Sequence, residues 1–158
     1  MSQTAPPVMG ATRLPSPPPA SGRGEAGTLI WRAALALVGV RFRLHGRVPE
    51  TGLDCVGLVA AAYAAVGFRA GFVPDDYRMR DVSVGQLEGW LRSAGLDAVD
   101  DCAVGDVVVS DMGRGQFHLM VAGDGACVHA HAGLRRVVLM PGILGAVVGR
   151  WRASTGSA

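Results

Sequence analysis

The sequence predicts an α+β domain in which N-terminal helices pack on a C-terminal antiparallel sheet. Two observations predict this class. Apolar residues recur at helical spacing only between residues 25 and 94, and short β-type runs separated by glycine-containing turns fill residues 107–151. Helices that precede all the strands favour segregated layers over the alternating order of α/β proteins. A chain of 158 residues has room for one such domain and a tail.

The domain is expected to cover residues 25–152. Residues 1–24 contain six of the nine prolines among small and polar side chains, and such a segment cannot build a buried face. We therefore predict a disordered proline-rich tail over residues 1–24 and a flexible C-terminus over residues 153–158.

Three helices are expected in the first part of the domain. The first covers residues 25–38 and stops at Gly39, and the second runs from Cys55 to Gly67 after an irregular stretch at residues 39–53. The third covers residues 83–94, with Ser83 as its N-cap. The apolar face of the second helix is expected in the core, and it consists of Val59, Ala62, Tyr63 and Val66.

Five strands are expected after the helices, and the turns between them contain GRG, GDG and PG. Short turns between successive runs predict an antiparallel meander. The runs cover residues 107–109, 117–121, 126–131, 137–140 and 146–151.

Composition excludes several classes of function. Fifteen basic residues nearly balance thirteen acids, for a net charge of +2, so we expect no nucleic-acid partner. The longest charge-free run, which contains residues 56–68, is too short to cross a bilayer, so no membrane span is expected. The N-terminus lacks the pattern of a secretory signal peptide, which predicts synthesis in the cytoplasm. Three cysteines without a CxxC pair favour reduced thiols.

Cys55 stands where the glycine-containing loop meets the second helix, in the segment TGLDCVGLV. Backbone amides at a helix N-terminus carry partial positive charge, so they can stabilise a thiolate or a developing oxyanion. A nucleophilic cysteine also needs a base that takes its proton. Cys55 is therefore a candidate nucleophile, although a lone cysteine at a helix start is more often a small packing residue.

Three of the four histidines lie in two successive predicted strands, and the fourth, His45, lies apart in the irregular stretch. His118 is in the first of these strands, and His129 and His131 are in the next. A tight GDG hairpin would bring His118 close to a downstream histidine, which would then orient it as a base. Periodicity puts His129 and His131 on the same face; a tight hairpin puts His129 nearer to His118 and His131 one pair further on.

A metal site is the weaker alternative for these residues. Cys127, His129 and His131 alternate along one strand, but the obvious fourth ligand, Cys102, lies in a loop without paired spacing. We therefore expect no metal and no other cofactor. Two acidic doublets are most simply solvated loop charges, and they are Asp75 with Asp76 and Asp100 with Asp101.

These motifs resemble the NlpC/P60 family of cysteine peptidases, papain-like enzymes that cut the peptide stems of bacterial peptidoglycan. DCVGLV is similar to the family's nucleophile segment, GDVVVSDM to the strand before the base, and FHLMVAGDGACVHA to the strands of the base and third residue. The resemblance covers most of residues 25–151. It implies a papain-like fold with Cys55 as nucleophile, His118 as base and His129 as the orienting residue, with His131 in reserve.

The resemblance also points to a substrate pocket around Cys55. In many family members an Asp before the cysteine, a Ser after it and an upstream Tyr resemble a pocket for the amino end of the stem peptide. This chain has Asp54, but Val56 replaces the Ser and Phe42 replaces the Tyr. A site that loses hydroxyl partners for an amine loses discrimination for it, so the end group of the substrate is expected to differ.

The function predicted from the sequence is a cysteine peptidase or amidase that hydrolyses an amide bond of peptidoglycan stem peptides through an acyl-enzyme on Cys55. The alternative is a catalytically inactive tail-tip or wall-binding module of the same fold. PDDYRMRDVS and GRWR resemble phage-type cell-wall peptidases encoded with tail genes of phages and gene transfer agents. That resemblance implies tail proteins as partners and delivery to the cell wall in a phage-like particle.

Overall fold

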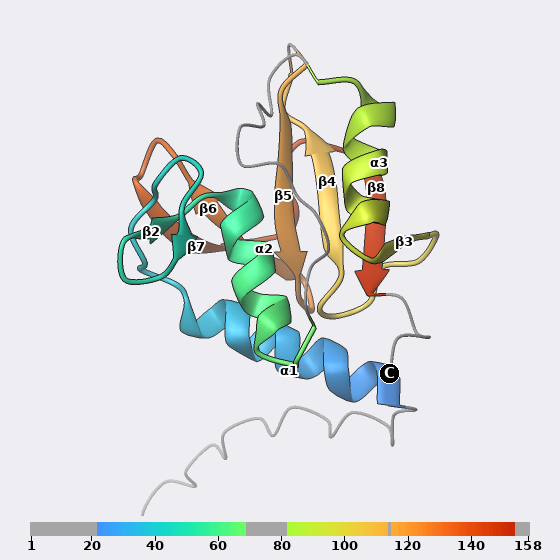
Figure 1. The fold of residues 1–158 in the computed structure, drawn as a ribbon, viewed down its shortest axis with the longest axis horizontal. Helices are drawn as coiled ribbons and strands as arrows, with labels where there is room; N and C mark the ends of the chain where they lie inside the picture. Colours follow the sequence, from blue (N-terminus) through green and yellow to red (C-terminus); the bar gives the residue numbers. More distant parts are fainter. Residues whose placement is uncertain (1–21, 69–81, 114, 154–158) are drawn as a thin grey trace, which may run out of the picture.

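The computed structural model describes residues 22–68, 82–113 and 115–153. Three helices, one two-stranded hairpin and one six-stranded sheet make up these ranges (Figure 1). The predicted tail lies mostly outside them, as do Asp75, Asp76 and most of the PDDYRMRDVS segment. Within the described ranges, none of the helices has the length and apolar character that a membrane span requires.

The three predicted helices are present. Helix α1 covers Gly22–Ala36, α2 covers Cys55–Ala64 and α3 covers Val84–Ser93. Ser83 caps α3 through a reciprocal pair: its hydroxyl accepts from the Gln86 amide, and the Gln86 side chain accepts from the Ser83 amide. Gly39 and Gly67 follow the first two helices with positive φ, a backbone region that glycine adopts without strain.

The large sheet is antiparallel, but it is not the simple meander that the sequence predicted. Its order is β3-β8-β4-β5-β6-β7, so β8 leaves the end of the meander and returns to pair with β4. This return covers the free edge of β4 and buries Trp151 opposite Val107. The strands are β3 (Leu96–Val99), β4 (Val107–Asp111), β5 (Phe117–Ala122), β6 (Ala126–His131), β7 (Arg136–Pro141) and β8 (Ala146–Ala153).

Strand β3 was not predicted at all. It begins directly after Gly95, has only four residues, and buries only Leu96 fully, so it carries almost no alternating pattern of its own. The 39–53 stretch likewise holds a small hairpin of β1 (Arg47–Val48) and β2 (Gly52–Leu53). Both elements exist because of their partners, since β3 pairs with β8 and the hairpin packs against α2.

The helices cover one face of the sheet, and the larger core lies between them. Leu58, Ala62 and Tyr63 of α2 are buried against alternate residues of β5, including Leu119 and Val121. A second, smaller cluster on the alternate side chains contains Val108, Met120, Ala122 and Cys127. The predicted α2 face is confirmed, with Val66 only partly buried.

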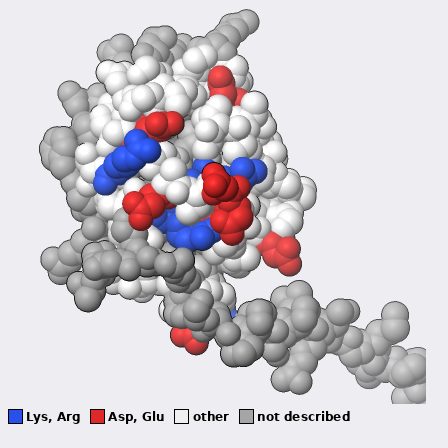
Figure 2. Space-filling view, turned by 90° about the vertical axis from the view of Figure 1, so that its right-hand side faces the viewer, with Lys and Arg blue, Asp and Glu red and all other residues white. Residues whose placement is uncertain are grey.

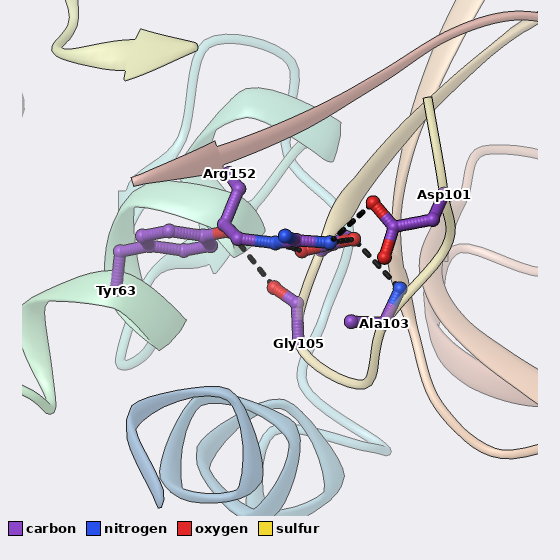
Figure 3. Close-up of polar contacts among 6 residues, drawn as sticks. Tyr63, Asp101, Ala103, Gly105 and Arg152 are labelled. Atoms are coloured by element: carbon purple, nitrogen blue, oxygen red, sulfur yellow. Dashed lines mark hydrogen bonds and ion pairs between the residues drawn. The ribbon is translucent and has the colours of Figure 1, made fainter. Parts of the chain in front are cut away.

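An ion pair between Arg152 and the buried Asp106 joins the end of β8 to the start of β4 (Figure 3). Arg152 of β8 donates to both carboxylate oxygens of Asp106, at 2.7 and 2.8 Å, and Asp106 also accepts from the Ala103 amide at 2.8 Å. Beside it, the Tyr63 hydroxyl donates to the carbonyl of Gly105 at 2.8 Å. The hydrogen bonds to Asp106 are the first cause of a raised pKa at Arg152. This network joins α2, β8 and the start of β4.

The surface on the right of Figure 1 carries both signs of charge. Figure 2 shows acidic and basic side chains interspersed on it, without a broad area of one sign. The ion pairs of the described residues include Arg92 with Glu88 on α3 and Arg152 with the exposed Asp101. Arg92 also lies over the Trp151 ring, 5.3 Å from its centroid.

The N-terminus of α2 is held by a close backbone approach. The carbonyl of Gly46 lies where a β-carbon on Gly57 would stand, and the carbonyl of Gly52 lies equally close to Gly46. The 39–53 stretch therefore wraps the first turn of α2 with no space for side chains. Glycine at these positions fixes where Cys55 and Asp54 lie.

We expect Gly57→Ala to destabilise the protein by roughly 1–3 kcal/mol, because the added methyl group forces the 39–53 stretch away from α2. Gly89→Ala is the matched control, because Gly89 also lies in a helix but a β-carbon there meets nothing within 4 Å. That control should leave stability unchanged or raise it by up to about 1 kcal/mol. Urea unfolding of both variants tests this; equal effects would contradict the close approach.

Candidate active site

Cys55 is the first residue of α2, as the sequence predicted, and it is buried. The backbone of Val56, of Cys55 itself and of Leu119 in β5 forms hydrogen bonds that lower the thiol pKa. Burial and the neighbouring Asp54 carboxylate outweigh them and raise that pKa to about 12. The resting sulfur is therefore a neutral thiol surrounded by backbone donors.

Asp54 is a buried N-cap whose carboxylate already has several donors. It accepts from the Gly57 amide at 2.8 Å, which caps the helix, and from the His45 amide at 2.9 Å. The Arg47 guanidinium adds a hydrogen bond and ion pair at 3.2 Å. The carboxylate next to the candidate nucleophile is thus held by partners within the protein, a guanidinium and two backbone amides among them.

His118 and His129 lie in contact. The Nε2 atom of His118 is 2.9 Å from Nδ1 of His129, and the two rings meet edge to face with centroids 5.0 Å apart. His131 does not touch His118 in any recorded contact of the described residues; its ring lies 5.5 Å from that of His129, and its Nδ1 accepts from the Leu134 amide.

The contact with Met140 lets the tautomers of both rings be assigned from the hydrogen-bond pattern. The Nε2 atom of His129 lies 2.9 Å from the Met140 sulfur, and a thioether can accept but not donate a hydrogen bond. His129 therefore carries its proton on Nε2 and accepts at Nδ1, so His118 donates from its own Nε2. The remaining nitrogen of His118, Nδ1, is left with a lone pair, as a base requires.

His118 and Cys55 are related through the backbone of β5. Side chains alternate along β5, so Leu119 points toward α2 and His118 points to the other face of the sheet. The Cys55 thiol lies close enough to β5 to interact with the backbone of Leu119. His118 directly precedes Leu119 in the chain, so the residue that carries the imidazole is the sequence neighbour of the one whose backbone contacts the sulfur. No hydrogen bond joins the two side chains within the described ranges, and their direct contact stays a prediction.

The separation of β5 from β6 explains why the ring of His118 meets that of His129. In the described ranges β5 and β6 pair only at Val121 with Val128 and Ala122 with Cys127, near the GDG turn. Beyond these pairs the strands separate, and Figure 1 shows α2 in front of the opening. Continued pairing would place His131 opposite His118, so the predicted register is wrong. His118 meets His129 because the strands diverge.

Burial keeps both rings neutral. Desolvation, followed by the nearby His129 and His131, lowers the pKa of His118 to about 4. Desolvation also lowers the pKa of His129. At neutral pH the site therefore holds a neutral thiol and a neutral imidazole rather than a preformed ion pair.

This depressed pKa predicts how stability depends on pH. The unfolded chain protonates His118 near pH 6.5, whereas the folded chain does so only near pH 4. Between these values the unfolded state binds more protons, so the free energy of unfolding should fall as the pH falls from about 6.5 to about 4. Urea unfolding across this range should show a shallower fall for His118→Gln. Parallel curves would contradict the buried neutral imidazole.

The remaining residues predicted for the site lie around α2 and β6. Phe42 and Val56 are partly buried against the larger core, and Phe42 pairs with Leu53, the neighbour of Asp54. Cys127 is buried with its sulfur 3.7 Å from that of Met120, whereas Cys102 is exposed. Within the described ranges, no group of three His, Cys, Asp or Glu side chains is arranged to hold a metal.

Sequence reasoning missed two contacts at this site, Arg47 on Asp54 and Met140 on His129. The arginine-rich composition of the 39–53 stretch was a signal for the first, because a buried carboxylate needs a charged partner. Nothing local marked Met140. It reaches His129 because β7 pairs with β6, with Cys127 opposite Met140.

Helices packed on one face of an antiparallel sheet, with a buried cysteine at the N-terminus of α2 and two histidines in contact on β5 and β6, define an α+β domain. Neither a protein-family model nor a curated protein sequence matches the chain. Solved structures match it, and one is the NlpC/p60 domain of the peptidoglycan hydrolase SagA, at 22% identity and a TM-score of 0.53 over 80% of this chain and 97% of that chain.

Two further solved structures are similar. RipB, a peptidoglycan hydrolase from Mycobacterium tuberculosis, is 22% identical with a TM-score of 0.52 over 80% of this chain and 63% of that chain. NlpC1 from Trichomonas vaginalis is 17% identical with a TM-score of 0.59 over 84% of this chain and 46% of that chain. These likenesses establish the fold: the chain has the NlpC/P60 fold that its motifs predicted.

Proposed function

We propose that the protein is a thiol hydrolase that cleaves an amide bond in the stem peptides of bacterial peptidoglycan. The observation that carries the proposal is the contact between His118 and His129, together with the position of Cys55 at the N-terminus of α2, the helix that packs on β5. The fold supports the substrate class, because it is shared with domains whose names describe peptidoglycan hydrolases, SagA and RipB.

The chemistry follows from the neutral pair. Nδ1 of His118 takes the proton of the Cys55 thiol as the sulfur attacks the carbonyl carbon, so charge separates only in the transition state. Backbone donors at the start of α2 stabilise the oxyanion. The imidazolium then protonates the leaving amine, and water hydrolyses the thioester to a carboxylic acid. His129 keeps the ring of His118 oriented throughout.

Delivery to the cell wall is part of the same proposal. The resemblance of the PDDYRMRDVS and GRWR segments to phage-type peptidases supports association with tail proteins of a phage or gene transfer agent. A particle of this kind would carry the enzyme from its synthesis in the cytoplasm to the wall.

The direct test is digestion of purified peptidoglycan with wild type and Cys55→Ala, followed by mass analysis of the released fragments. We expect stem-peptide fragments from the wild type only, with masses that identify the bond. Cys102→Ala is the matched control and should release the same fragments as the wild type, because Cys102 is an exposed thiol. Equal release by Cys55→Ala, or no release by any protein on several wall types, would contradict the proposal.

The second candidate is an inactive wall-binding module of the same fold. The replacement of two pocket hydroxyls by Phe42 and Val56 favours it, together with the occupied carboxylate of Asp54. This candidate predicts sedimentation with peptidoglycan and no released fragments.

The orienting residue can be identified by comparing two histidines. We expect His129→Ala to lower turnover by about one order of magnitude or more, because His118 loses the acceptor that fixes its tautomer. His131→Ala should lower turnover much less, since the ring of His131 lies against that of His129 and has no hydrogen bond or ring contact with His118 in the described part of the chain. Steady-state rates of fragment release by the two variants check this. A greater loss in His131→Ala than in His129→Ala would assign the orienting role to His131.

A further inference from the structure

We propose that Met140 is a positioning residue for the hydrolysis: its sulfur accepts the Nε2 proton of His129 and so keeps a lone pair on Nδ1 of His118, the atom that takes the proton of Cys55. The inference rests on the proposed function and adds a residue of β7 that acts through the two histidines. It comes from the contact on Nε2 of His129, the ring nitrogen that does not face His118.

The first observation is that strand register places the Met140 sulfur at His129. In the pairing of β6 with β7, Cys127 lies opposite Met140 and His129 lies opposite Val138. Met140 and His129 are therefore diagonal neighbours whose side chains share one face of the sheet. The Met140 side chain packs against the smaller core, and its sulfur lies 2.9 Å from Nε2 of His129. Register and packing together hold this contact in place.

The second observation is that the His129 ring is buried with few acceptors around it. His129 is only 2% exposed, so solvent has little access to its ring. The Ala130 backbone also interacts with the ring and raises its pKa, but the hydrogen bonds of the ring within the described ranges are those to His118 and Met140. A buried donor without an acceptor is costly. The Met140 sulfur therefore stabilises the tautomer of His129 that carries its proton on Nε2.

The third observation is that the two rings must change tautomer together. The hydrogen bond between Nε2 of His118 and Nδ1 of His129 is 2.9 Å long and contains one proton. When His118 supplies that proton, Nδ1 of His118 keeps its lone pair and can act as a base. When His129 supplies it, neutral His118 must carry its own proton on Nδ1. That atom can then no longer accept the proton of the Cys55 thiol.

Met140 favours the first of these two arrangements. In the second arrangement, Nε2 of His129 has a lone pair that faces the lone pairs of the thioether, and no hydrogen bond forms between them. Leucine has a similar volume but neither donates nor accepts a hydrogen bond, so Met140→Leu removes the preference without opening a cavity. His118 would then be found more often in the tautomer that cannot act as the base.

The first test reads the tautomers from proton–nitrogen NMR correlation spectra of the histidine rings, assigned with single His→Gln variants. We expect the wild type to carry the ring protons of His118 and His129 on Nε2. Met140→Leu should move a resolved share of both rings, in equal proportion, to the tautomer with the proton on Nδ1. Protons on Nδ1 in the wild type, or wild-type tautomers in Met140→Leu, would overturn the inference. The wild-type spectrum applies even if the variant does not fold.

Met120→Leu is the matched control for both tests. Met120 belongs to the same smaller core, but its sulfur lies 3.7 Å from that of Cys127. The same substitution there changes the packing of the core and leaves the acceptor on His129 in place. We expect wild-type tautomers and a kcat within about twofold of the wild type, because volume-conserving exchanges of this kind are well tolerated.

The second test is turnover of stem peptides. The kcat of Met140→Leu should fall about fivefold or more with KM within about twofold of the wild type, because the change of tautomer removes the base and leaves substrate binding intact. Met140→Gln restores an acceptor and should recover most of this loss. A Gln variant as slow as the Leu variant would overturn the acceptor role. No turnover by the wild type would overturn the proposed function, and the spectra would still decide the inference.

Discussion

The Cys55→Ser variant should lose about three orders of magnitude or more in turnover of peptidoglycan stems while keeping its fold. Serine fits the position, because it differs from cysteine by one atom and can still accept the backbone hydrogen bonds at the start of α2. Its hydroxyl, however, ionises far less readily than a thiol and is the poorer nucleophile toward a neutral imidazole base. Removing the nucleophile of a serine-protease triad can lower kcat by as much as about a millionfold.

The measurement is kcat from fragment release, together with the melting temperature of each variant. Cys102→Ser is the matched control for the substitution, and its kcat should remain within about twofold of the wild type, since Cys102 is exposed and lies in a loop away from α2. A Cys55→Ser enzyme with near-wild-type kcat would show that Cys55 is a packing residue.

The largest effect on stability should come from Arg152→Met. Asp106 is almost fully buried, and this substitution removes both of its hydrogen bonds from the guanidinium while filling most of the same volume. Loss of one partner leaves an uncompensated buried charge, which destabilises proteins by about 3–5 kcal/mol. We therefore expect the melting temperature to fall by about 10 °C or more.

Glu88→Gln provides the comparison, because it removes a carboxylate from the exposed pair with Arg92 on α3, where the two side chains are 3.8 Å apart. Exposed pairs of this kind contribute about 0.5 kcal/mol or less. Thermal and urea unfolding of both variants separate the two cases. Similar small effects would mean that the Asp106 carboxylate finds other donors when Arg152 is gone.

The sequence predicted what depends on local chemistry. Ser83 was predicted as the N-cap of α3, and the second helix was predicted to begin at Cys55; both are confirmed. The contact between His118 and His129 was predicted from a short hairpin between β5 and β6, although the predicted register of that hairpin was wrong. The fold class followed from the order of helices and strands.

What the sequence could not predict depends on partners far along the chain. Strand β3 is defined by its pairing with β8, and β8 by the edge of β4, about forty residues earlier. Met140 and Arg47 likewise owe their roles to β-pairing and loop packing, which no residue pattern within either segment announces. Pairing between segments far apart in the sequence is therefore the main feature of the fold and the site that the sequence did not predict.

Two residue pairs join β5 to β6, fewer than join any other neighbouring strands of this sheet, so we expect the sheet to flex most easily there, as two plates that meet at this join. One plate is β3, β8, β4 and β5; the other is β6 and β7, to which the 39–43 segment is hydrogen-bonded. A joint of two residue pairs resists twisting far less than the five pairs between β4 and β5. We expect amide protons beside this joint to exchange with solvent sooner than those of β4, and a bound peptide to slow them by bridging the plates. The proposed base His118 would then lie on one plate and its partner His129 on the other, so that a peptide bound across the join would also align the two rings.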